Sequence, residues 1–271
     1  MNLTCTHYLH CDPEGFTTYS TDGNLEFVRC SNCGLIWRSP ESADISREYE
    51  EHYFSSKNYL RNRNHKIEKS GWFIDMALQH FPTAGSLLEI GCSVGNTLEA
   101  ARLRKLSHLG TDVSTYAVEY CRSCGLNAEV KSLESLVEER HPFDIVYMQH
   151  VLEHFRDPFL TVRQCYQLLN PGGVLIIIVP NSGYARAEKQ RGRHRFYSMK
   201  GVGPEHYVYF NYQSLEKVLE KEGFEVVQKN YPFRVKNNPS PSFFLNRIFR
   251  KSLRLFGADQ EIVVLARKKS A

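Results

Sequence analysis

The chain has 271 residues, of which 42% are hydrophobic and 24% are charged, a balance typical of soluble globular proteins with a sizeable core. The formal net charge of +4 is too small for a dedicated nucleic-acid-binding surface. The longest strongly apolar run, Val174 to Val179, is too short to cross a bilayer, and no signal peptide is visible, so we expect a cytoplasmic protein without a membrane span.

Residues 1–40 form the first predicted unit, which we interpret as a small zinc-binding element. The run Cys30-Ser31-Asn32-Cys33-Gly34 is typical of a zinc knuckle, in which two thiolates lie on a tight turn. In a reducing cytosol, metal binding is more plausible for such cysteines than disulfide pairing. The predicted ligands of a structural zinc ion are Cys5, Cys11, Cys30 and Cys33, with His10 as an alternative to Cys11. Ordinary cysteines in a small β-hairpin are the other interpretation.

Residues 41–84 form the second predicted unit, a helical cap or linker rich in aromatic and charged side chains. Apolar residues at near-helical spacing between Ile67 and Leu78 predict a helix there. The aromatic residues that precede it could cover a cofactor and exclude water, or could simply pack on the sheet; they are Tyr49, Tyr53, Phe54 and Tyr59.

Residues 85–271 form the third predicted unit, in which apolar strands alternate with amphipathic helices. This alternation predicts a parallel sheet with helices on both faces. The predicted strands lie at residues 86–90, 109–112, 128–131, 143–148, 173–179, 224–229 and 261–267. The predicted helices lie at residues 96–106, 115–124, 158–169 and 213–222. We interpret residues 231–259 as an insertion between the last two strands.

A glycine-containing turn after the first of these strands is the most informative motif. In the run Glu89-Ile90-Gly91-Cys92-Ser93-Val94-Gly95, small residues let the backbone bend sharply and approach a ligand closely. The helix that follows offers unpaired backbone N–H groups to polar ligand atoms. The nucleophile elbow of α/β-hydrolases has a similar Gly-x-Ser-x-Gly sequence, but no convincing Asp and His that could complete its catalytic triad follow at strand ends. A tight turn without a ligand is the remaining alternative.

An acidic residue, Asp112, stands where the next strand ends. A carboxylate at this place can accept hydrogen bonds from ribose hydroxyl groups, as in dinucleotide-binding folds. Because it follows a glycine turn, we favour a ligand-binding role over that of a solvated surface carboxylate.

Five motifs in one order resemble those of the class I S-adenosylmethionine-dependent methyltransferases. They lie at residues 88–95, 110–114, 143–146, 150–158 and 168–175. One departure is Ser93, which stands where the family usually has glycine. The resemblance implies an α/β, Rossmann-like, seven-stranded, mostly parallel sheet with helices on both faces, preceded by the small cysteine-containing element. Residues 206–224 resemble small-molecule methyltransferases such as quinone-pathway, sugar and polyketide enzymes.

The resemblance also implies a role for individual residues. Those that would hold the methionine half of S-adenosylmethionine are Glu89, Gly91, Ser93 and Gly95. Asp112 would bind the ribose and Val113 would pack on the adenine, which Ser132 and Leu133 would flank. The residues implied to lie beneath the transferring methyl are Gln149 and His150.

An oxygen or carbon acceptor of a methyl group usually has to lose a proton, and histidine suits this work because its reference pKa is near 6.5. The candidate catalytic bases are His150, His154 and His206. His154 could instead hold its loop by hydrogen bonds, and Glu153 could orient a histidine or cap a helix.

These patterns predict an S-adenosylmethionine-dependent methyltransferase that acts on a small-molecule acceptor at oxygen or carbon. The alternatives are methylation of RNA or protein, and regulatory binding of the cofactor without turnover. The basic stretches at residues 186–200 and 247–254 lack the density of a phosphate-tracking groove, so a nucleic-acid partner is not expected.

Overall fold

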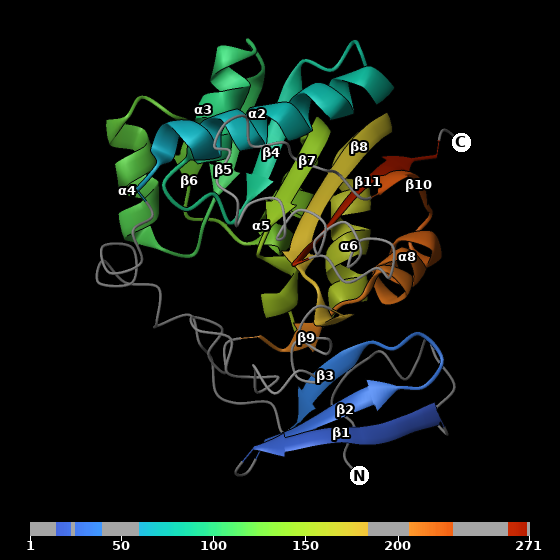
Figure 1. Ribbon diagram of the computed structural model, residues 1–271. Coiled ribbons are helices and arrows are strands. Elements are labelled where there is room, and N and C mark those ends of the chain that lie inside the picture. Colours follow the sequence, from blue (N-terminus) through green and yellow to red (C-terminus); the bar gives the residue numbers. More distant parts are fainter. Residues whose placement is uncertain (1–14, 23–24, 40–59, 184–205, 230–259, 270–271) are drawn as a thin grey trace, which may run out of the picture.

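A seven-stranded sheet forms the centre of the larger part of the protein (Figure 1). The computed structural model describes residues 15–22, 25–39, 60–183, 206–229 and 260–269. The strands, in spatial order, are β10 (Phe224–Lys229), β11 (Glu261–Lys268), β8 (Leu169–Pro180), β7 (Phe143–Gln149), β4 (Ser86–Ile90), β5 (Ser107–Thr111) and β6 (Ala128–Glu129). All neighbours pair in parallel except β11, which is antiparallel to both β8 and β10. The predicted fold class is confirmed.

Helices cover both faces of this sheet (Figure 1). One face carries α2 (Arg63–His80) and α3 (Asn96–Leu103), and the other carries α5 (Leu133–Glu139), α6 (Pro158–Gln167) and α8 (Tyr212–Lys221). The helix α4 (Thr115–Ser123) packs beside β6, and a short 3-10 helix, η4 (Leu152–His154), follows β7.

Alternating side chains of the central strands explain this layering. In β7, Ile145 belongs to the same buried cluster as Phe73 of α2, whereas Val146 belongs to the cluster of Phe159 of α6. Successive side chains of a strand point to opposite faces, so a strand covered on both sides is apolar throughout. The uninterrupted apolar run in β8 has this origin.

Two elements differ most from their predicted ranges. The strand β8 begins at Leu169 instead of residue 173, because a bulge in its pairing with β7 absorbs the turn-forming residues 170–173. The helix α3 ends at Leu103 instead of residue 106, because Lys105 adopts a φ of 60° and the Leu106 N–H then donates to the Ala101 carbonyl.

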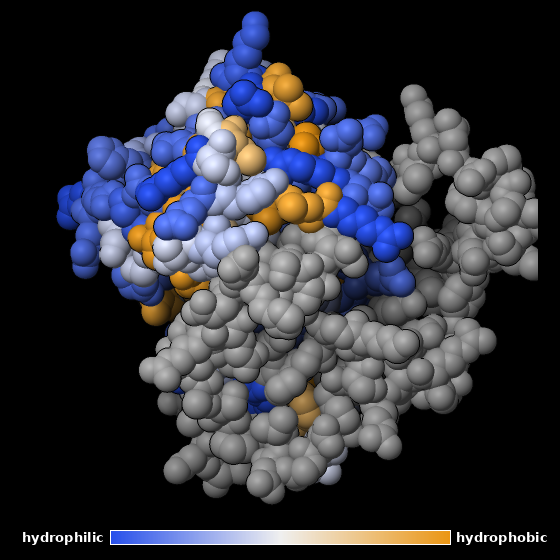
Figure 2. All heavy atoms as spheres, turned by 90° about the vertical axis from the view of Figure 1, so that its left-hand side faces the viewer, coloured by the Kyte–Doolittle hydropathy of each residue, from blue (hydrophilic) through white to orange (hydrophobic). Residues whose placement is uncertain are grey.

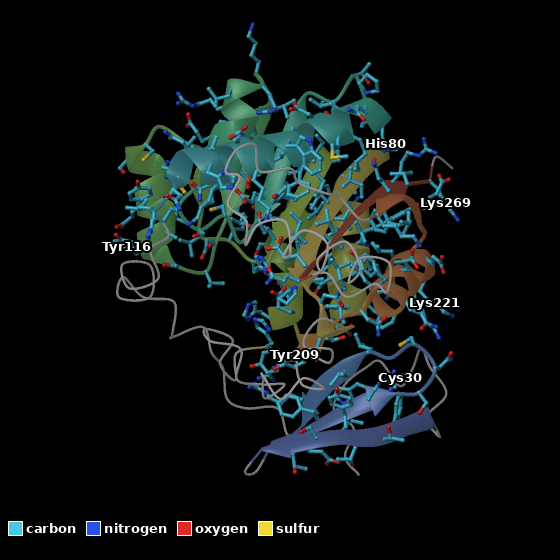
Figure 3. The ribbon with its side chains drawn as sticks, in the orientation of Figure 1. Cys30, His80, Tyr116, Tyr209, Lys221 and Lys269 are labelled. Atoms are coloured by element: carbon cyan, nitrogen blue, oxygen red, sulfur yellow. The ribbon has the colours of Figure 1, made fainter. Side chains whose placement is uncertain are left out.

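A second, antiparallel sheet contains the N-terminal strands β1 (Phe16–Asp22), β2 (Leu25–Cys30) and β3 (Ile36–Ser39). Its fourth strand, β9 (Val208–Tyr209), comes from the range predicted as the third unit. Tyr209 lies against Phe27 with ring centroids 5.8 Å apart, and Figure 3 shows it next to this sheet. Val28 and Trp37 belong to the buried cluster that also contains α6 and α8, so the two sheets share one core.

The left-hand side of Figure 1 is turned toward the viewer in Figure 2, where the described surface is mostly hydrophilic and apolar residues occur in small, separate groups. No helix in the described part of the chain is long and apolar enough to cross a membrane.

Asp144 at the start of β7 ties three strands together at one edge of the sheet. Its carboxylate accepts hydrogen bonds from the Gly85 N–H, the Ser86 N–H and hydroxyl, and the Asn170 side-chain amide, at 2.8–3.1 Å. Burial alone would raise the pKa of Asp144, but these hydrogen bonds outweigh it and lower the pKa.

Replacing Asp144 by alanine is therefore expected to lower the free energy of unfolding by about 2–3 kcal/mol, because charged hydrogen bonds are lost and their donors stay partly buried. Urea unfolding of the two proteins measures this difference. A change of less than about 0.5 kcal/mol would show that the network contributes no more than an ordinary surface group.

Candidate functional site

The turn between β4 and α3 has the sharp backbone that the sequence predicted. Gly91, Ser93 and Gly95 have φ values of 71°, 49° and 71°. The turn is fixed to the neighbouring strand because the N–H groups of Gly91 and Cys92 donate to the Thr111 carbonyl. Ser93 stands where the family usually has glycine. It adopts the left-handed conformation, which costs a residue with a Cβ some energy, and the turn is therefore present despite the change of residue.

Gly91 leaves no room for a side chain. A Cβ atom at this position would lie 2.4 Å from Cγ2 of Val151, a residue that follows β7. Glycine is thus required by both the backbone conformation and the close approach of Val151.

Asp112 lies directly beside this turn. Its Oδ2 accepts a hydrogen bond from the Ser93 N–H at 2.8 Å, and its Oδ1 accepts one from the Ser114 N–H at 2.9 Å. Burial raises the pKa of Asp112, against the hydrogen bonds from these N–H groups. The adjacent Val113 is 63% exposed, which suits an apolar side chain that packs on a ligand. The structure therefore brings together the residues expected to bind the ribose, the adenine and the methionine half.

Three buried oxygen atoms around the turn have no hydrogen-bond partner in the described part of the chain: Glu89 Oε2, Ser93 Oγ and Asn96 Oδ1. Burial raises the pKa of Glu89 well above its ordinary value, against the hydrogen bond from Thr97. Unsatisfied buried acceptors are rare in folded proteins and call for a specific explanation. A ligand with a cationic amino group would satisfy them, which fits the methionine half of S-adenosylmethionine.

The two residues expected to flank the adenine have different surroundings. Ser132 caps α5, since its hydroxyl accepts a hydrogen bond from the Ser135 N–H at 3.2 Å. The side chain of Leu133 is only 5% exposed and belongs to the hydrophobic core.

The residues after β7 lie at the same edge of the sheet as the glycine turn. Gln149 accepts a hydrogen bond from the Tyr147 hydroxyl at 2.9 Å. His150 adopts a φ of 54°, and its N–H donates to the Ile178 carbonyl at 2.8 Å. Strained backbone of this kind is often found at functional sites, so it singles out His150.

Two residues that the sequence patterns did not single out hold His150 in place. Its Nε2 lies 3.0 Å from Glu261 Oε1 at the start of β11, and Glu261 Oε2 lies 2.9 Å from Lys69 Nζ of α2. Burial alone would lower the pKa of His150, but the carboxylates of Glu153 and Glu261 outweigh it and raise the pKa to about 9. At neutral pH His150 is therefore protonated.

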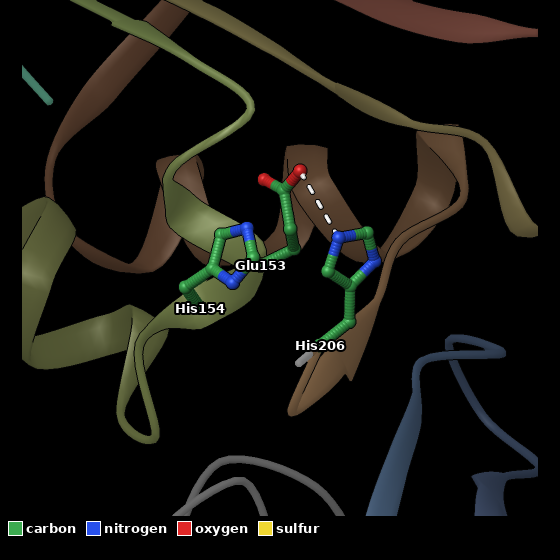
Figure 4. Close-up of side chains that lie close together, drawn as sticks. All are labelled: Glu153, His154 and His206. Atoms are coloured by element: carbon green, nitrogen blue, oxygen red, sulfur yellow. Dashed lines mark ion pairs between the residues drawn. The ribbon is translucent and has the colours of Figure 1, made fainter. Parts of the chain in front are cut away.

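The other two candidate histidines lie around Glu153 (Figure 4). The rings of His154 and His206 meet edge to face, with centroids 4.7 Å apart. Glu153 Oε1 lies 3.9 Å from His206 Nε2 and 3.6 Å from His150 Nδ1. His150 thus lies beside the same carboxylate as His206, and the structure brings all three candidate bases together.

The environment separates the protonation states of these histidines. Burial lowers the pKa of His206 to about 4, so this imidazole is neutral at neutral pH. Burial alone would raise the pKa of Glu153, but its histidine neighbours, His150 first, outweigh it and lower the pKa. The site therefore combines an imidazolium, a buried carboxylate and a neutral imidazole.

The contact between His150 and Glu261 predicts a bell-shaped pH dependence of their coupling free energy. The pKa of His150 is raised from 6.5 to about 9, so its stabilising contribution is complete below pH 6.5 and is lost as the pH rises through 9. The pKa of Glu261 is lowered from 4.5 to about 2, so its contribution is lost as the pH falls through 2.

A double-mutant cycle with His150→Ala and Glu261→Gln measures this coupling by denaturant unfolding. We expect about 1 kcal/mol near pH 5.5, discounted for solvent screening because the His150 side chain is 41% exposed. A coupling free energy that stays constant from pH 3 to pH 10 would contradict the assigned pairing.

The Cys30–Cys33 turn links β2 to β3. Gly34 N–H donates to the Cys30 carbonyl at 2.9 Å, and both cysteine side chains are buried. The Asn211 side chain, which caps α8, donates to the Cys33 carbonyl at 3.1 Å and so connects this turn to the larger sheet. Cys5, Cys11 and His10 lie outside the described residues, as do the aromatic residues 49–59.

Comparisons with known proteins agree with this geometry. Residues 59–229 match a family described as a methyltransferase domain. The ubiquinone biosynthesis O-methyltransferase of Chelativorans sp. (strain BNC1) is 30% identical over 101 residues, which are 35% of this chain and 40% of that protein. The protein of the same description from Xylella fastidiosa (strain 9a5c) is 28% identical over 153 residues, which are 46% of this chain and 62% of that protein. The matched part thus spans 40% to 62% of these relatives' lengths.

A solved structure shows that the fold is shared. The S-adenosylmethionine-dependent methyltransferase from Archaeoglobus fulgidus superposes with a TM-score of 0.57 at 18% identity, over 80% of this chain and 100% of that one. Together with the family match over residues 59–229, this likeness shows that the chain belongs to the methyltransferase domain family and has the Rossmann-like fold of S-adenosylmethionine-dependent methyltransferases.

Proposed function

We propose that the chain transfers a methyl group from S-adenosylmethionine to a small-molecule acceptor, at oxygen or carbon. The observation that carries this proposal is the left-handed turn at Gly91–Gly95, lined by unpartnered buried oxygens and closed by Asp112. A cationic ligand with a ribose suits this arrangement. When bound, S-adenosylmethionine supplies a methyl group that is already activated on a sulfonium.

The residues of this chain would bind and orient the reactants. Glu89, Gly91, Ser93 and Gly95 would hold the methionine half, Asp112 the ribose and Val113 the adenine. Ser132 and Leu133 would lie near the adenine, with Leu133 restricted to main-chain contacts because its side chain is buried. Because the activated group comes with the cofactor, the protein contributes mainly proximity, orientation and exclusion of water.

Removal of the acceptor's proton is the step for which side-chain chemistry is needed, and the group of residues around Glu153 supplies it. Gln149 and His150 would lie nearest the transferring methyl. His150 holds a proton at neutral pH and is therefore suited to donate a hydrogen bond, whereas the neutral imidazole of His206 can accept a proton. His154 contacts the His206 ring and would orient it.

The family relatives support a small acceptor with a hydroxyl group. The relatives from Chelativorans and Xylella are named as O-methyltransferases of ubiquinone biosynthesis. A phenolic oxygen is an acceptor that needs only deprotonation and in-line approach to the methyl. The cytoplasmic location stays a prediction.

The proposal is tested by incubating the protein with labelled S-adenosylmethionine and, separately, with small molecules, RNA and protein, and by measuring which acceptors receive the labelled methyl group. We expect label in small phenolic or enolic compounds and none in RNA or protein. Label that appears only in RNA or protein would replace the small acceptor by a macromolecule. Tight cofactor binding without transfer to any panel would favour a regulatory role.

We also propose a structural zinc ion, with Cys30 and Cys33 as two of its ligands and Cys5 and Cys11 as the others. The paired, buried thiols on a tight turn support it, and four protein ligands would leave no open position for catalysis. Elemental analysis should show one zinc ion per chain fewer in the Cys30→Ser/Cys33→Ser double variant than in the unchanged protein. Equal zinc content in the two proteins would contradict this ligand set.

A further inference from the structure

A carboxylate and two imidazoles converge between η4 and the segment that leads into β9 (Figure 4). Glu153, His154 and His206 each offer one ligand atom, and these atoms all lie within 4.8 Å of one another. The main chain holds the two segments together, because the Tyr207 N–H donates to the Glu153 carbonyl at 2.9 Å. We propose that Glu153, His154 and His206 bind a divalent transition-metal ion.

The burial of Glu153 points to a ligand independently of this convergence. Glu153 is only 1% exposed, and neither carboxylate oxygen has a hydrogen-bond partner in the described part of the chain. The neighbouring imidazole nitrogens of His150 and His206 lie 3.6 Å and 3.9 Å from Oε1, too far for a hydrogen bond. The histidine neighbours favour the charged carboxylate, but neither oxygen has a donor within hydrogen-bond distance in the described part of the chain, and coordination of a cation would supply that missing partner.

The chemistry of the three side chains selects the class of ion. Two imidazoles and one carboxylate form the type of set that binds Zn²⁺, Fe²⁺ or Co²⁺ and leaves positions open for another ligand. In a tetrahedral site, two ligand atoms that each lie about 2.1 Å from the ion are about 3.4 Å apart. The three ligand atoms, which lie within 4.8 Å of one another, would therefore move closer together by up to about 1.4 Å when the ion binds.

An ion with an open position would deepen the proposed function, and this role depends on that function. The acceptor's oxygen would occupy the open position, and the positive charge would lower the pKa of its O–H group. The proton would then leave to solvent water, and His206 would act as a ligand in place of a free base. Substrates would be restricted to acceptors with a hydroxyl group able to reach the ion.

Titration of the full-length, chelator-treated protein with Co²⁺, followed by visible absorption, tests the site directly. In the Cys30→Ser/Cys33→Ser double variant, in which the proposed cysteine site is lost, the proposal predicts saturable d–d bands without the near-ultraviolet charge-transfer band that thiolate ligands produce. In the same double-variant background, Glu153→Gln and His206→Ala should each weaken Co²⁺ binding by about 100-fold, since each removes one ligand of three. His141→Ala, which removes an exposed histidine elsewhere, should leave the affinity within about twofold.

Two results would overturn the proposal. One is a Co²⁺ affinity of Glu153→Gln, in that background, equal to that of the double cysteine variant; this variant conserves the size of the side chain and so tests the site even if His206→Ala does not fold. The other is a spectrum that shows only thiolate ligands and disappears in the double cysteine variant. Calorimetry of the same samples with S-adenosylhomocysteine separates the two claims: loss of that binding would count against the proposed function, and loss of Co²⁺ binding alone against the metal site.

Discussion

Replacing Gly91 by alanine is expected to abolish measurable binding of S-adenosylhomocysteine and to lower the free energy of unfolding by about 3 kcal/mol or more. A left-handed conformation costs a residue with a Cβ about 1–2 kcal/mol. The new Cβ would also lie 2.4 Å from Val151 Cγ2, so Val151 and the turn must move apart. Calorimetric titration and urea unfolding of the variant measure the two effects.

Gly125 provides a matched control for the Gly91 substitution. It has a φ of 72°, almost the same as that of Gly91, but no atom of the described residues lies within 4 Å of the position of its missing Cβ. Gly125→Ala should therefore show only the backbone cost of about 1–2 kcal/mol and should keep its affinity for the ligand. If the two variants lose equal stability and both bind, the contact with Val151 has no role in shaping the turn.

Replacing Asp112 by alanine is expected to raise the Kd for S-adenosylhomocysteine by about 10- to 100-fold, which corresponds to a loss of about 1–3 kcal/mol in charged hydrogen bonds. The structure gives two reasons for this loss. We propose that the carboxylate accepts hydrogen bonds from ribose hydroxyls, and it also fixes the glycine turn through the Ser93 N–H. Calorimetric titration measures the affinity.

The surface carboxylate of Asp75 provides the control for Asp112. Asp75 lies on α2 and forms an ion pair with Arg104, at 50% exposure, away from the glycine turn. Asp75→Ala should leave the Kd within about twofold, since exposed ion pairs contribute little. An unchanged Kd in Asp112→Ala would remove Asp112 from the binding site.

The parts of the fold that the sequence predicted are those that local patterns determine. The order of apolar strands and amphipathic helices was sufficient to predict a parallel sheet with helices on both faces, and the family resemblance added its Rossmann-like, seven-stranded type. The glycine turn was recognisable because small residues are needed where the backbone approaches a ligand. The turn keeps its left-handed conformation at Ser93, where the family usually has glycine.

The parts that the sequence did not predict depend on contacts between distant segments. Glu261 and Lys69 are 192 residues apart, and no local pattern indicates that they meet beside His150. The strand β9 has only two residues, too few to show the alternation of apolar and polar side chains that predicts a strand. Its pairing with β3 is accompanied by the contact between the rings of Tyr209 and Phe27. The burial of the Leu133 side chain depends on how α5 packs on the core, which the local sequence does not show, and the place of Leu133 beside the adenine stays a prediction.

The division of the chain at residues 40 and 84 stays a prediction. The N-terminal strands share a core with α6 and α8, and β9 joins their sheet. These contacts suggest that the cysteine-containing element and the larger sheet unfold together. Two separate unfolding transitions would instead support independent units.

Calorimetric titration of the purified protein with S-adenosylmethionine and S-adenosylhomocysteine, with NAD as a control, tests the central claim most directly. The geometry of the glycine turn and Asp112 predicts micromolar binding of both sulfur-containing ligands and no binding of NAD. Absence of binding by either sulfur-containing ligand, or binding of NAD in their place, would contradict the assignment of this turn as an S-adenosylmethionine site.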